Sequence, residues 1–230
     1  MTNKRYKTIG MVVAMEKEIK PFFEKFGKGF KEIKVGGYIL FKCKINGKKI
    51  YLIKSGIGEI YASAATEILI SVFKCDIILN FGVCGSLHDD ISVYETIVVK
   101  GVVHYDFDLS AIDGTKVGQY PGYDVVIKTN ENLVDFVLSL NENIKPAICA
   151  SSDKFVADEK IKENLVKVYG ADVCDMECAA VLLTSITAGV PALIIKAVSD
   201  GKGGAEEFAR RVNKASEAYL DTLKNIIERI

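Results

Sequence analysis

An apolar run from Pro191 to Val198, ending in Ser199 and Asp200, constrains the fold more than any other part of the chain. Lys196 is its one charged residue, and such a run is typical of a strand buried on both faces of a parallel sheet. Open α/β sheets bind ligands in the crevice beyond the carboxyl ends of their strands. We therefore expect Asp200 to point into such a crevice.

Two more carboxylates precede this strand. Asp175, Met176 and Glu177 stand at the start of an apolar segment that we predict to be helical from Met176 to Ala188. Charged residues are almost never fully buried unless they are paired. Inside an otherwise apolar helix, Glu177 is therefore better explained by a function than by a place on the surface.

Apolar runs alternate with amphipathic segments along the rest of the chain. We predict strands at residues 8–14, 36–45, 48–54, 76–81, 95–105 and 146–150, and helices at 15–23, 60–73, 130–140, 157–168 and from 205 onward. Asn46-Gly47 joins two of these strands as a hairpin. The alternation predicts an α/β fold: a single domain over residues 1–230, with three α/β/α layers around a mixed central sheet.

The composition argues against several classes of protein. With 49% hydrophobic and 26% charged residues the chain is globular, and its 30 basic and 30 acidic residues cancel. We therefore expect neither a nucleic-acid partner nor a membrane partner. The sequence has no recognisable secretory leader and no apolar run long enough to span a bilayer, so we expect a cytoplasmic protein.

The cysteines and histidines lack the spacing of a metal site. Six cysteines, at positions 43, 75, 84, 149, 174 and 178, are expected to be reduced thiols. His88 and His104 have no partner pattern, and we interpret them as solvated or capping residues. We expect no metal and no cofactor.

Residues 106–124 form a long segment with little periodicity. A loop of this length in a compact domain is usually functional or covers a partner. Tyr120 and Tyr123 within it, and Tyr105 before it, are either packed loop aromatics or part of a dimer surface. We favour the dimer surface, because tyrosine is enriched at interfaces.

Eight short motifs occur in order along nearly the whole chain. They are Ala-Met-Glu-x-Glu at 14–18, Ser-Gly-Ile-Gly at 55–58, Asn-Phe-Gly-x-x-Gly at 80–85, Tyr-Asp-x-Asp at 105–108, Gly-Gln-x-Pro-Gly at 118–122, Ser-Asp-x-Phe at 152–155, Met-Glu-x-Ala at 176–179 and Ser-Asp at 199–200. In this order they resemble the 5′-methylthioadenosine/S-adenosylhomocysteine nucleosidases, within the purine nucleoside phosphorylase and hydrolase family.

The resemblance implies hydrolysis of the N-glycosidic bond of a purine nucleoside, which releases adenine and a 5-substituted ribose. Asp200 matches the acid that protonates N7 of the base, and Ser199 matches a residue that helps to hold this acid in place. Glu18 matches the base that takes a proton from the attacking water. Glu177 matches the carboxylate that binds the ribose 2′ and 3′ hydroxyls.

The resemblance also implies which residues form the walls of the site. Met176 matches a residue that packs on the sugar, Phe155 the ring stacked on the base, and Val156 the backbone that reads the edge of the base. An apolar wall around the 5′ substituent, supplied in part by the second subunit of a homodimer, is matched by Ile57, Leu109, Ile112 and Pro121, with Phe208 as a further member.

The chemistry requires such a set of residues independently of the resemblance. Cleavage passes through an oxocarbenium-like sugar, so a proton on the leaving nitrogen and negative charge near the ring both lower the barrier. An unperturbed Asp, with a pKa of about 3.9, is ionised at neutral pH. We therefore predict that burial raises the pKa of Asp200.

Water rather than phosphate is the predicted nucleophile. Phosphorylases of the family carry arginines after the first strand and before the glycine loop, whereas the arginines of this chain are at 5, 210, 211 and 229. A carboxylate at Glu18 repels phosphate. Two alternatives stay open: a phosphorylase that uses Lys54 or backbone amides for phosphate, and a non-catalytic nucleoside-binding protein on the same fold.

Several positions depart from the nucleosidase pattern. Val83, near the sugar, replaces a serine; Lys196 replaces an arginine; Asp175 replaces a glutamate. The loop at 201–205 is shorter than usual. These changes leave open the identity of the 5′ substituent and the choice between adenine and a 6-oxopurine.

Each candidate also has a simpler interpretation when taken alone. Asp200 could be a helix N-cap, and Met176 and Phe155 could be core residues. Glu18 could be a solvated helix residue, although it cannot share a helix face with Glu16, two positions away. The pair of glycines at 82 and 85 fits a phosphate cradle or a tight turn near a sugar equally well.

Overall fold

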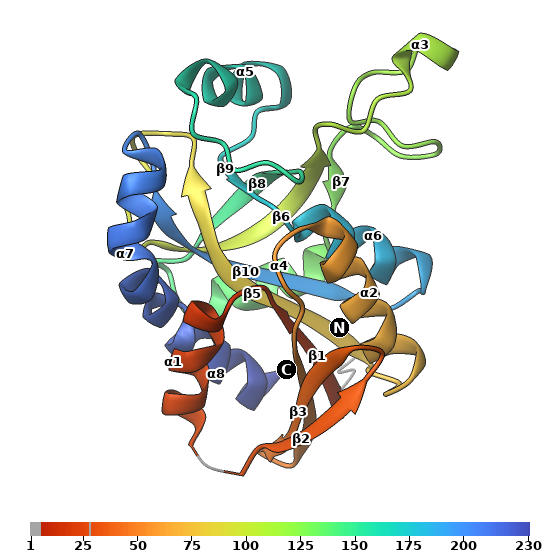
Figure 1. Cartoon of the computed structure of the whole chain (residues 1–230), viewed down its shortest axis with the longest axis vertical. Coiled ribbons are helices and arrows are strands. Elements are labelled where there is room, and N and C mark those ends of the chain that lie inside the picture. Colours follow the sequence, from red (N-terminus) through yellow and green to blue (C-terminus); the bar gives the residue numbers. More distant parts are fainter. Residues whose placement is uncertain (1–5, 28) are drawn as a thin grey trace.

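A mixed sheet of ten strands organises the part of the chain that the structure describes, residues 6–27 and 29–230 of a computed structural model (Figure 1). The strands are β1 (Thr8–Val13), β2 (Lys31–Val35), β3 (Tyr38–Ile45), β4 (Lys48–Lys54), β5 (Ile77–Ser86), β6 (Thr96–His104), β7 (Ile127–Lys128), β8 (Lys145–Ser151), β9 (Val173–Asp175) and β10 (Ala192–Asp200). The helices are α1 (Glu16–Phe26), α2 (Glu59–Ser71), α3 (Ser110–Asp113), α4 (Glu131–Leu140), α5 (Glu159–Tyr169), α6 (Cys178–Thr187), α7 (Gly204–Ala218) and α8 (Leu220–Arg229).

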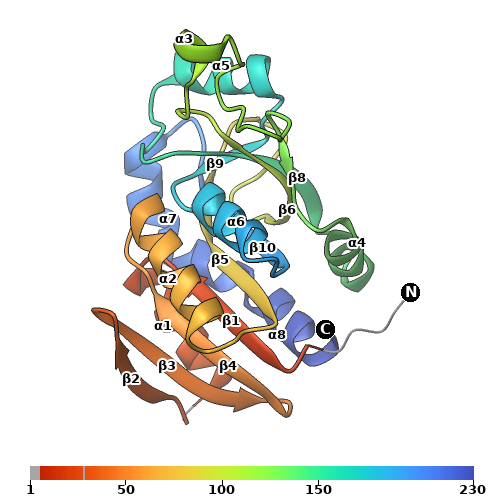
Figure 2. The same ribbon diagram turned by 90° about the vertical axis from the view of Figure 1, so that its right-hand side faces the viewer.

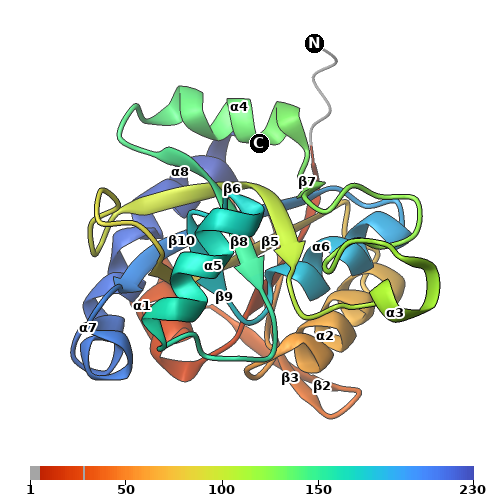
Figure 3. The same cartoon turned by 90° about the horizontal axis from the view of Figure 1, so that it is seen from above.

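Part of the sheet closes on itself around its longest strand. β5 pairs in parallel with β1 and β10 and antiparallel with β9. β10 continues to β6, β6 to β8 and β8 to β9, so these strands and β5 form a ring, which Figure 3 views from above. β1, β4, β3 and β2 extend from it as an open sheet. Because β1, β5 and β10 are parallel, their carboxyl ends meet at one edge.

Helices cover both faces of the sheet, with α2 and α6 on one side and α1, α7 and α8 on the other (Figures 1 and 2). In β10, Leu193 and Ile195 pack into the core beneath α1, α7 and α8, whereas Ile194 and Val198 pack with α2 and α6. Every residue of β10 is buried. Burial of this strand on both faces and the three-layer α/β fold with a mixed sheet are therefore confirmed.

Three fully buried aromatic side chains fix α1 against the sheet. The ring of Phe22, on α1, stacks on that of Phe81, on β5, with centroids 5.4 Å apart, and Phe81 meets Tyr219 edge-on at 5.5 Å. Full burial of a large apolar side chain contributes about 1.5–3 kcal/mol. The Tyr219 hydroxyl donates a hydrogen bond to the backbone carbonyl of Glu18 at 3.1 Å. These contacts therefore fix the first turn of α1, which carries Glu18, against the sheet.

Some element boundaries differ from those predicted from the sequence. The C-terminal helix is two helices that meet at Tyr219, whose side chain is fully buried in the core. β10 starts after Pro191, which has no N–H for the ladder, and it includes Asp200. The helix predicted from Met176 begins at Cys178, as α6. Within residues 6–27 and 29–230, we find no helix with the length and apolar composition needed to cross a membrane.

Candidate active site

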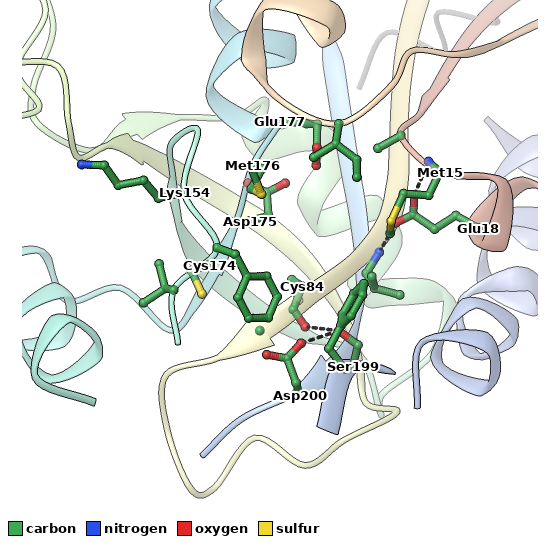
Figure 4. A pocket seen from close by; sticks show the side chains of 17 residues that line it. Met15, Glu18, Cys84, Lys154, Cys174, Asp175, Met176, Glu177, Ser199 and Asp200 are labelled. Atoms are coloured by element: carbon green, nitrogen blue, oxygen red, sulfur yellow. Dashed lines mark hydrogen bonds between the residues drawn. The ribbon is translucent and has the colours of Figure 1, made fainter. Parts of the chain in front are cut away.

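A cavity of about 350 Å³ lies where β1, β5, β9 and β10 end, a size usual for a small-molecule site. Figure 4 shows side chains from these strands and from the segments that follow them, gathered around it. Ten of the residues selected from the sequence line this cavity: Glu18, Ile57, Val83, Phe155, Val156, Met176, Glu177, Ser199, Asp200 and Phe208.

Asp200 ends β10 on one side of the cavity and is 3% exposed. The Ser199 hydroxyl donates to Asp200 Oδ1 at 2.6 Å, and it also lies 3.2 Å from the carbonyl oxygen of Cys84. Burial raises the pKa of Asp200 to about 6, against the opposing effect of the Ser199 hydrogen bond. This carboxyl group therefore holds a proton over a wider pH range than an exposed Asp, as a general acid must.

Glu18, in the first turn of α1, lines the same cavity and is 2% exposed (Figure 4). Its Oε2 accepts a hydrogen bond from the Met15 N–H at 2.8 Å, and its Oε1 accepts one from the Val83 N–H at 2.8 Å. Burial raises the pKa of Glu18, while Lys196 and the two amides act in the opposite direction. The carboxylate is thus fixed in orientation and kept out of bulk solvent. Glu16, by contrast, is exposed and paired with Lys54.

The absence of a side chain at Gly82 makes room for Glu18. A Cβ atom at this position would lie 2.4 Å from Glu18 Oε1, closer than real contacts allow. Gly82 lies within β5, which continues through the glycine-rich segment to Ser86. The glycine-rich segment therefore brings strand backbone close to a buried carboxylate. The Val83 N–H, a donor that a phosphate cradle would use, is already bound to Glu18.

Glu177 stands immediately before α6 and contributes a third carboxylate to the cavity. Its Oε1 accepts a hydrogen bond from the Gly58 N–H at 3.0 Å. Burial raises the pKa of Glu177 to about 8; the charge of Lys196 opposes this shift, and the nearby Asp175 and Glu18 add to it. The carboxyl group has one oxygen left to accept hydrogen bonds from a polar ligand.

Lys196, the charged residue within the apolar run of β10, neutralises part of this acidic cluster. Its Nζ lies 2.8 Å from Asp175 Oδ2 and 4.0 Å from Glu177 Oε2, and the Lys196 side chain is 2% exposed. Although burial alone would raise the pKa of Asp175, the charge of Lys196 holds it below its usual range. A buried cation among three acids allows part of the cluster to remain ionised.

Apolar side chains form the remaining walls. The rings of Phe155 and Phe208 meet edge-on with centroids 5.7 Å apart, and Met176 lies beside Asp175 and Glu177 in the view of Figure 4. Phe155 is 45% exposed and Ile57 is 53% exposed, which marks the mouth of the cavity. A flat apolar ligand with a polar edge, such as a purine on a sugar, fits this combination of rings and carboxylates.

Comparison with known proteins agrees with this geometry. The sequence model of the phosphorylase superfamily matches residues 8–230. The chain belongs to this superfamily. Among its relatives, an aminodeoxyfutalosine nucleosidase from Helicobacter pylori is 34% identical over 217 residues, 93% of this chain and 91% of the relative. A 5′-methylthioadenosine/S-adenosylhomocysteine nucleosidase from Staphylococcus haemolyticus is 29% identical, over 95% of this chain and 100% of the relative.

A solved structure of the superfamily supports the same assignment. The crystal structure of 5′-methylthioadenosine/S-adenosylhomocysteine nucleosidase from Helicobacter pylori, with butyl-thio-DADMe-Immucillin-A, superimposes with a TM-score of 0.93 at 30% identity. It covers 97% of this chain and 99% of the other. The resemblance stated from eight sequence motifs is therefore confirmed.

Three residues selected from the sequence do not line the cavity of the single chain: Leu109, Ile112 and Pro121. They lie in and beside the arm that carries α3, which projects from the body of the molecule (Figure 1). Ile112 is 82% exposed. Their place in the wall of a superfamily site stays a prediction that requires a second subunit.

The structure also adds residues that the sequence reasoning did not select. Cys84, Cys174 and Lys154 line the cavity, and the two cysteines had no signal beyond their apolar surroundings. His104 was interpreted as solvated or capping, but it is half-buried, with Nε2 2.9 Å from Glu59 Oε2 and 3.0 Å from Asp106 Oδ1. That interpretation is wrong, because the fold brings Glu59, at the start of α2, and Tyr120 against this ring.

Cys149, Asp175 and Cys178 come close enough to suggest a metal site that their sequence spacing does not predict. The Cys149 thiol lies 3.4 Å from Asp175 Oδ1, and Asp175 is already paired with Lys196. Burial raises the pKa of Cys178 to about 11 and that of Cys149 well above its usual value. Both thiols therefore favour the protonated form, as buried cysteines in apolar surroundings do.

Proposed function

We propose that this chain hydrolyses the N-glycosidic bond of a purine nucleoside, 5′-methylthioadenosine and/or S-adenosylhomocysteine, and releases adenine and a 5-substituted ribose. One observation carries the proposal: two buried carboxyl groups, Asp200 and Glu18, line one cavity with a third, Glu177, beside them. The names of related proteins add a further candidate, aminodeoxyfutalosine.

Asp200 acts as the general acid. In its protonated form it donates to N7 of the purine, so that the base leaves as a neutral species and the electrons of the glycosidic bond pass into the ring system. A pKa of about 6 supports this role. Phe155 stacks on the base, the backbone of Val156 reads its edge, and Phe208, which meets Phe155 edge-on, belongs to the apolar wall around the 5′ substituent.

Glu18 acts as the general base. It takes a proton from water as the oxygen attacks the anomeric carbon, and the two amides that bind its carboxylate fix the direction of attack. Glu177 accepts hydrogen bonds from the 2′ and 3′ hydroxyls, and Met176 packs on the sugar. The negative charge of the Glu18 carboxylate stabilises the developing oxocarbenium ion until Glu18 accepts the proton.

The surroundings of Glu18 favour water over phosphate. Among the described residues that line the cavity, none is an arginine, and Arg5 lies outside the described residues. The N–H groups of Val83 and Met15 are bound to the Glu18 carboxylate, and Lys54 is paired with exposed Glu16 at 2.6 Å. A multiply charged anion beside Glu18 would therefore find repulsion rather than donors.

A homodimer completes the mouth of the cavity in this proposal. Ile57, Ile60 and Tyr61, which precede and begin α2, are 53%, 78% and 58% exposed. Ile112 on the projecting arm is still more exposed. Apolar side chains grouped in this way mark interaction surfaces. The six free thiols support a reducing, cytoplasmic location.

Release of free base from a panel of nucleosides tests the proposal. The purified protein should cleave 5′-methylthioadenosine, S-adenosylhomocysteine or aminodeoxyfutalosine at equal rates with and without phosphate, and should leave a 6-oxopurine nucleoside such as inosine intact. A requirement for phosphate would select the phosphorylase alternative. Tight binding of adenine with no turnover of any nucleoside would select the non-catalytic binding protein.

A further inference from the structure

Gly201, the residue that follows the catalytic acid, is bound from two sides. Residues 201–203 connect β10, which ends at Asp200, to α7, which begins at Gly204. The Asp200–Gly201 peptide group carries the Gly201 N–H, so binding of Gly201 restricts the backbone from which the Asp200 side chain projects. Two charged side chains, one from α5 and one from α7, bind Gly201.

Glu207, on α7, binds the N–H side of the loop. Its Oε2 accepts hydrogen bonds from Gly201 N–H at 2.8 Å and from Gly203 N–H at 3.2 Å. Its Oε1 is paired with Arg211. The Glu207 side chain is 13% exposed, and the hydrogen bond from Gly201 is the main cause that lowers its pKa. The carboxylate is therefore charged, and both of its oxygens are occupied.

The loop and Glu207 fit each other closely. A Cβ atom at Gly203 would lie 2.7 Å from Glu207 Cβ. A residue with a side chain at this position would displace Glu207 or the loop. The glycine at position 203 therefore allows the loop to approach the Glu207 side chain closely.

Lys162, on α5, binds the carbonyl oxygen of Gly201, which lies in the next peptide group along the chain. Its Nζ donates to the Gly201 carbonyl oxygen and to Glu159 Oε1, the latter at 2.9 Å. The Lys162 side chain is 5% exposed. Burying an ammonium group is costly unless it is hydrogen-bonded and paired. The Gly201 carbonyl and Glu159 provide these partners.

We propose that Glu207 and Lys162 form a clamp on Gly201 that positions the carboxyl group of Asp200 for proton transfer. Neither residue lines the cavity, so both act through Gly201 as positioning residues. The inference rests on the proposed function, in which Asp200 is the general acid.

The clamp also acts on Asp200 by charge. Four polar or charged groups act on Asp200. One, Ser199, is on its own strand, and three are on neighbouring elements: Lys162 on α5, Glu207 on α7 and the Cys174 thiol on β9. Burial is the main cause of the raised pKa of Asp200. The Ser199 hydrogen bond and the charge of Lys162 lower this pKa, whereas the charge of Glu207 raises it. The two members of the clamp therefore have opposite electrostatic effects.

Amide hydrogen exchange measures the clamp without any substrate. In the wild-type protein the amides of Gly201 and Gly203 should be protected, because both are hydrogen-bonded to Glu207. Glu207→Ala should remove this protection. Glu206→Ala is the matched control: Glu206 precedes Glu207 on α7, its side chain is 88% exposed, and it should leave exchange unchanged.

Kinetics measure the consequence for Asp200. Glu207→Ala should lower kcat about 10- to 100-fold, the range expected when a catalytic group is misplaced, with KM within about threefold. Glu206→Ala should leave both within about twofold. A normal kcat in Glu207→Ala, or a raised KM at normal kcat, would overturn the positioning role.

The pH–activity profiles of two variants distinguish an electrostatic effect on Asp200 from a general loss of structure. Activity falls as pH rises through the pKa of Asp200, because the acid must be protonated. Glu207→Gln removes a negative charge, so this fall should move to lower pH. Lys162→Met removes a positive charge, so the fall should move to higher pH. Shifts in the same direction, or none, would count against the clamp.

Failure of the clamp and failure of the proposed function give different results. If the wild-type protein cleaves nucleosides but Gly201 and Gly203 exchange freely, the clamp is wrong and the function stands. If it cleaves none, the proposed function fails. NMR titration of Asp200 in Glu207→Gln and Lys162→Met, together with the exchange data, then still decides whether the clamp exists.

Discussion

The interior of the cavity and its mouth differ in almost every physical property. Inside, Glu18 and Asp200 are 2% and 3% exposed, and each carboxyl group has a specific hydrogen-bond donor. At the mouth, Ile57 and Phe155 are about half exposed, and the arm that carries Ile112 lies outside the cavity of the single chain. In the single chain the interior is enclosed and the mouth is open to solvent.

This difference separates reaction type from substrate choice. Proton transfer requires groups fixed to within a fraction of an ångström, and only buried, hydrogen-bonded side chains are fixed in that way. Recognition of a 5′ substituent by apolar contact needs area rather than exact placement, so it can be shared between subunits. Changes inside should therefore abolish turnover, whereas changes at the mouth should alter affinity.

The interior should be most sensitive at Glu18. Glu18→Gln preserves size but removes the group that accepts a proton from water, so kcat should fall by about 10³- to 10⁴-fold, near the upper range for a general base. Nucleoside binding measured by calorimetry should persist. Glu16→Gln, two residues away and exposed, is the control and should retain full activity. Unchanged turnover in Glu18→Gln would move the base to another residue.

Asp200 should come next. Asp200→Asn removes the transferable proton, so kcat should fall about 10²- to 10³-fold. The sign of the pH dependence follows from the raised pKa of about 6: wild-type kcat/KM should decline as Asp200 loses its proton above this pH. The asparagine variant should lack this decline in its pH–rate profile. A variant with near-normal rates, or with the same alkaline decline, would contradict the assignment of the acid.

The interior was also the part that the sequence could predict. The apolar run of β10 has a strong signal because every residue is buried, and its end at Asp200 follows from that pattern. Glu177 drew attention as a carboxylate beside an apolar helix. Most of the other residues that meet in the cavity were selected by the resemblance; Glu18, for example, has the pattern of a solvated helix residue when taken alone.

Contacts between distant elements could not be read in the same way. Lys196 and Asp175 form their ion pair between β10 and β9, and β9 has three residues, too few for a periodic signal. Lys162 and Glu207 look like ordinary polar residues of amphipathic helices. The break at Tyr219 was hidden because the three- and four-residue apolar steps continue through it. Such features depend on the tertiary fold, which local patterns do not contain.

The smallest effect should come from the mouth. Ile112→Glu places a charge on the arm, 82% exposed in the single chain, and should weaken a dimer by burying that charge at the interface. The mass measured by sedimentation should fall from that of a dimer, twice the chain mass of 25.2 kDa, towards that of a single chain. KM for a nucleoside with an apolar 5′ group should rise about tenfold, and kcat should stay within about threefold, since the interior is intact. Val168→Glu, on an exposed position of α5, is the control and should change neither quantity. A wild-type protein that sediments as a monomer with full activity would show that the interior suffices and that the arm has another use.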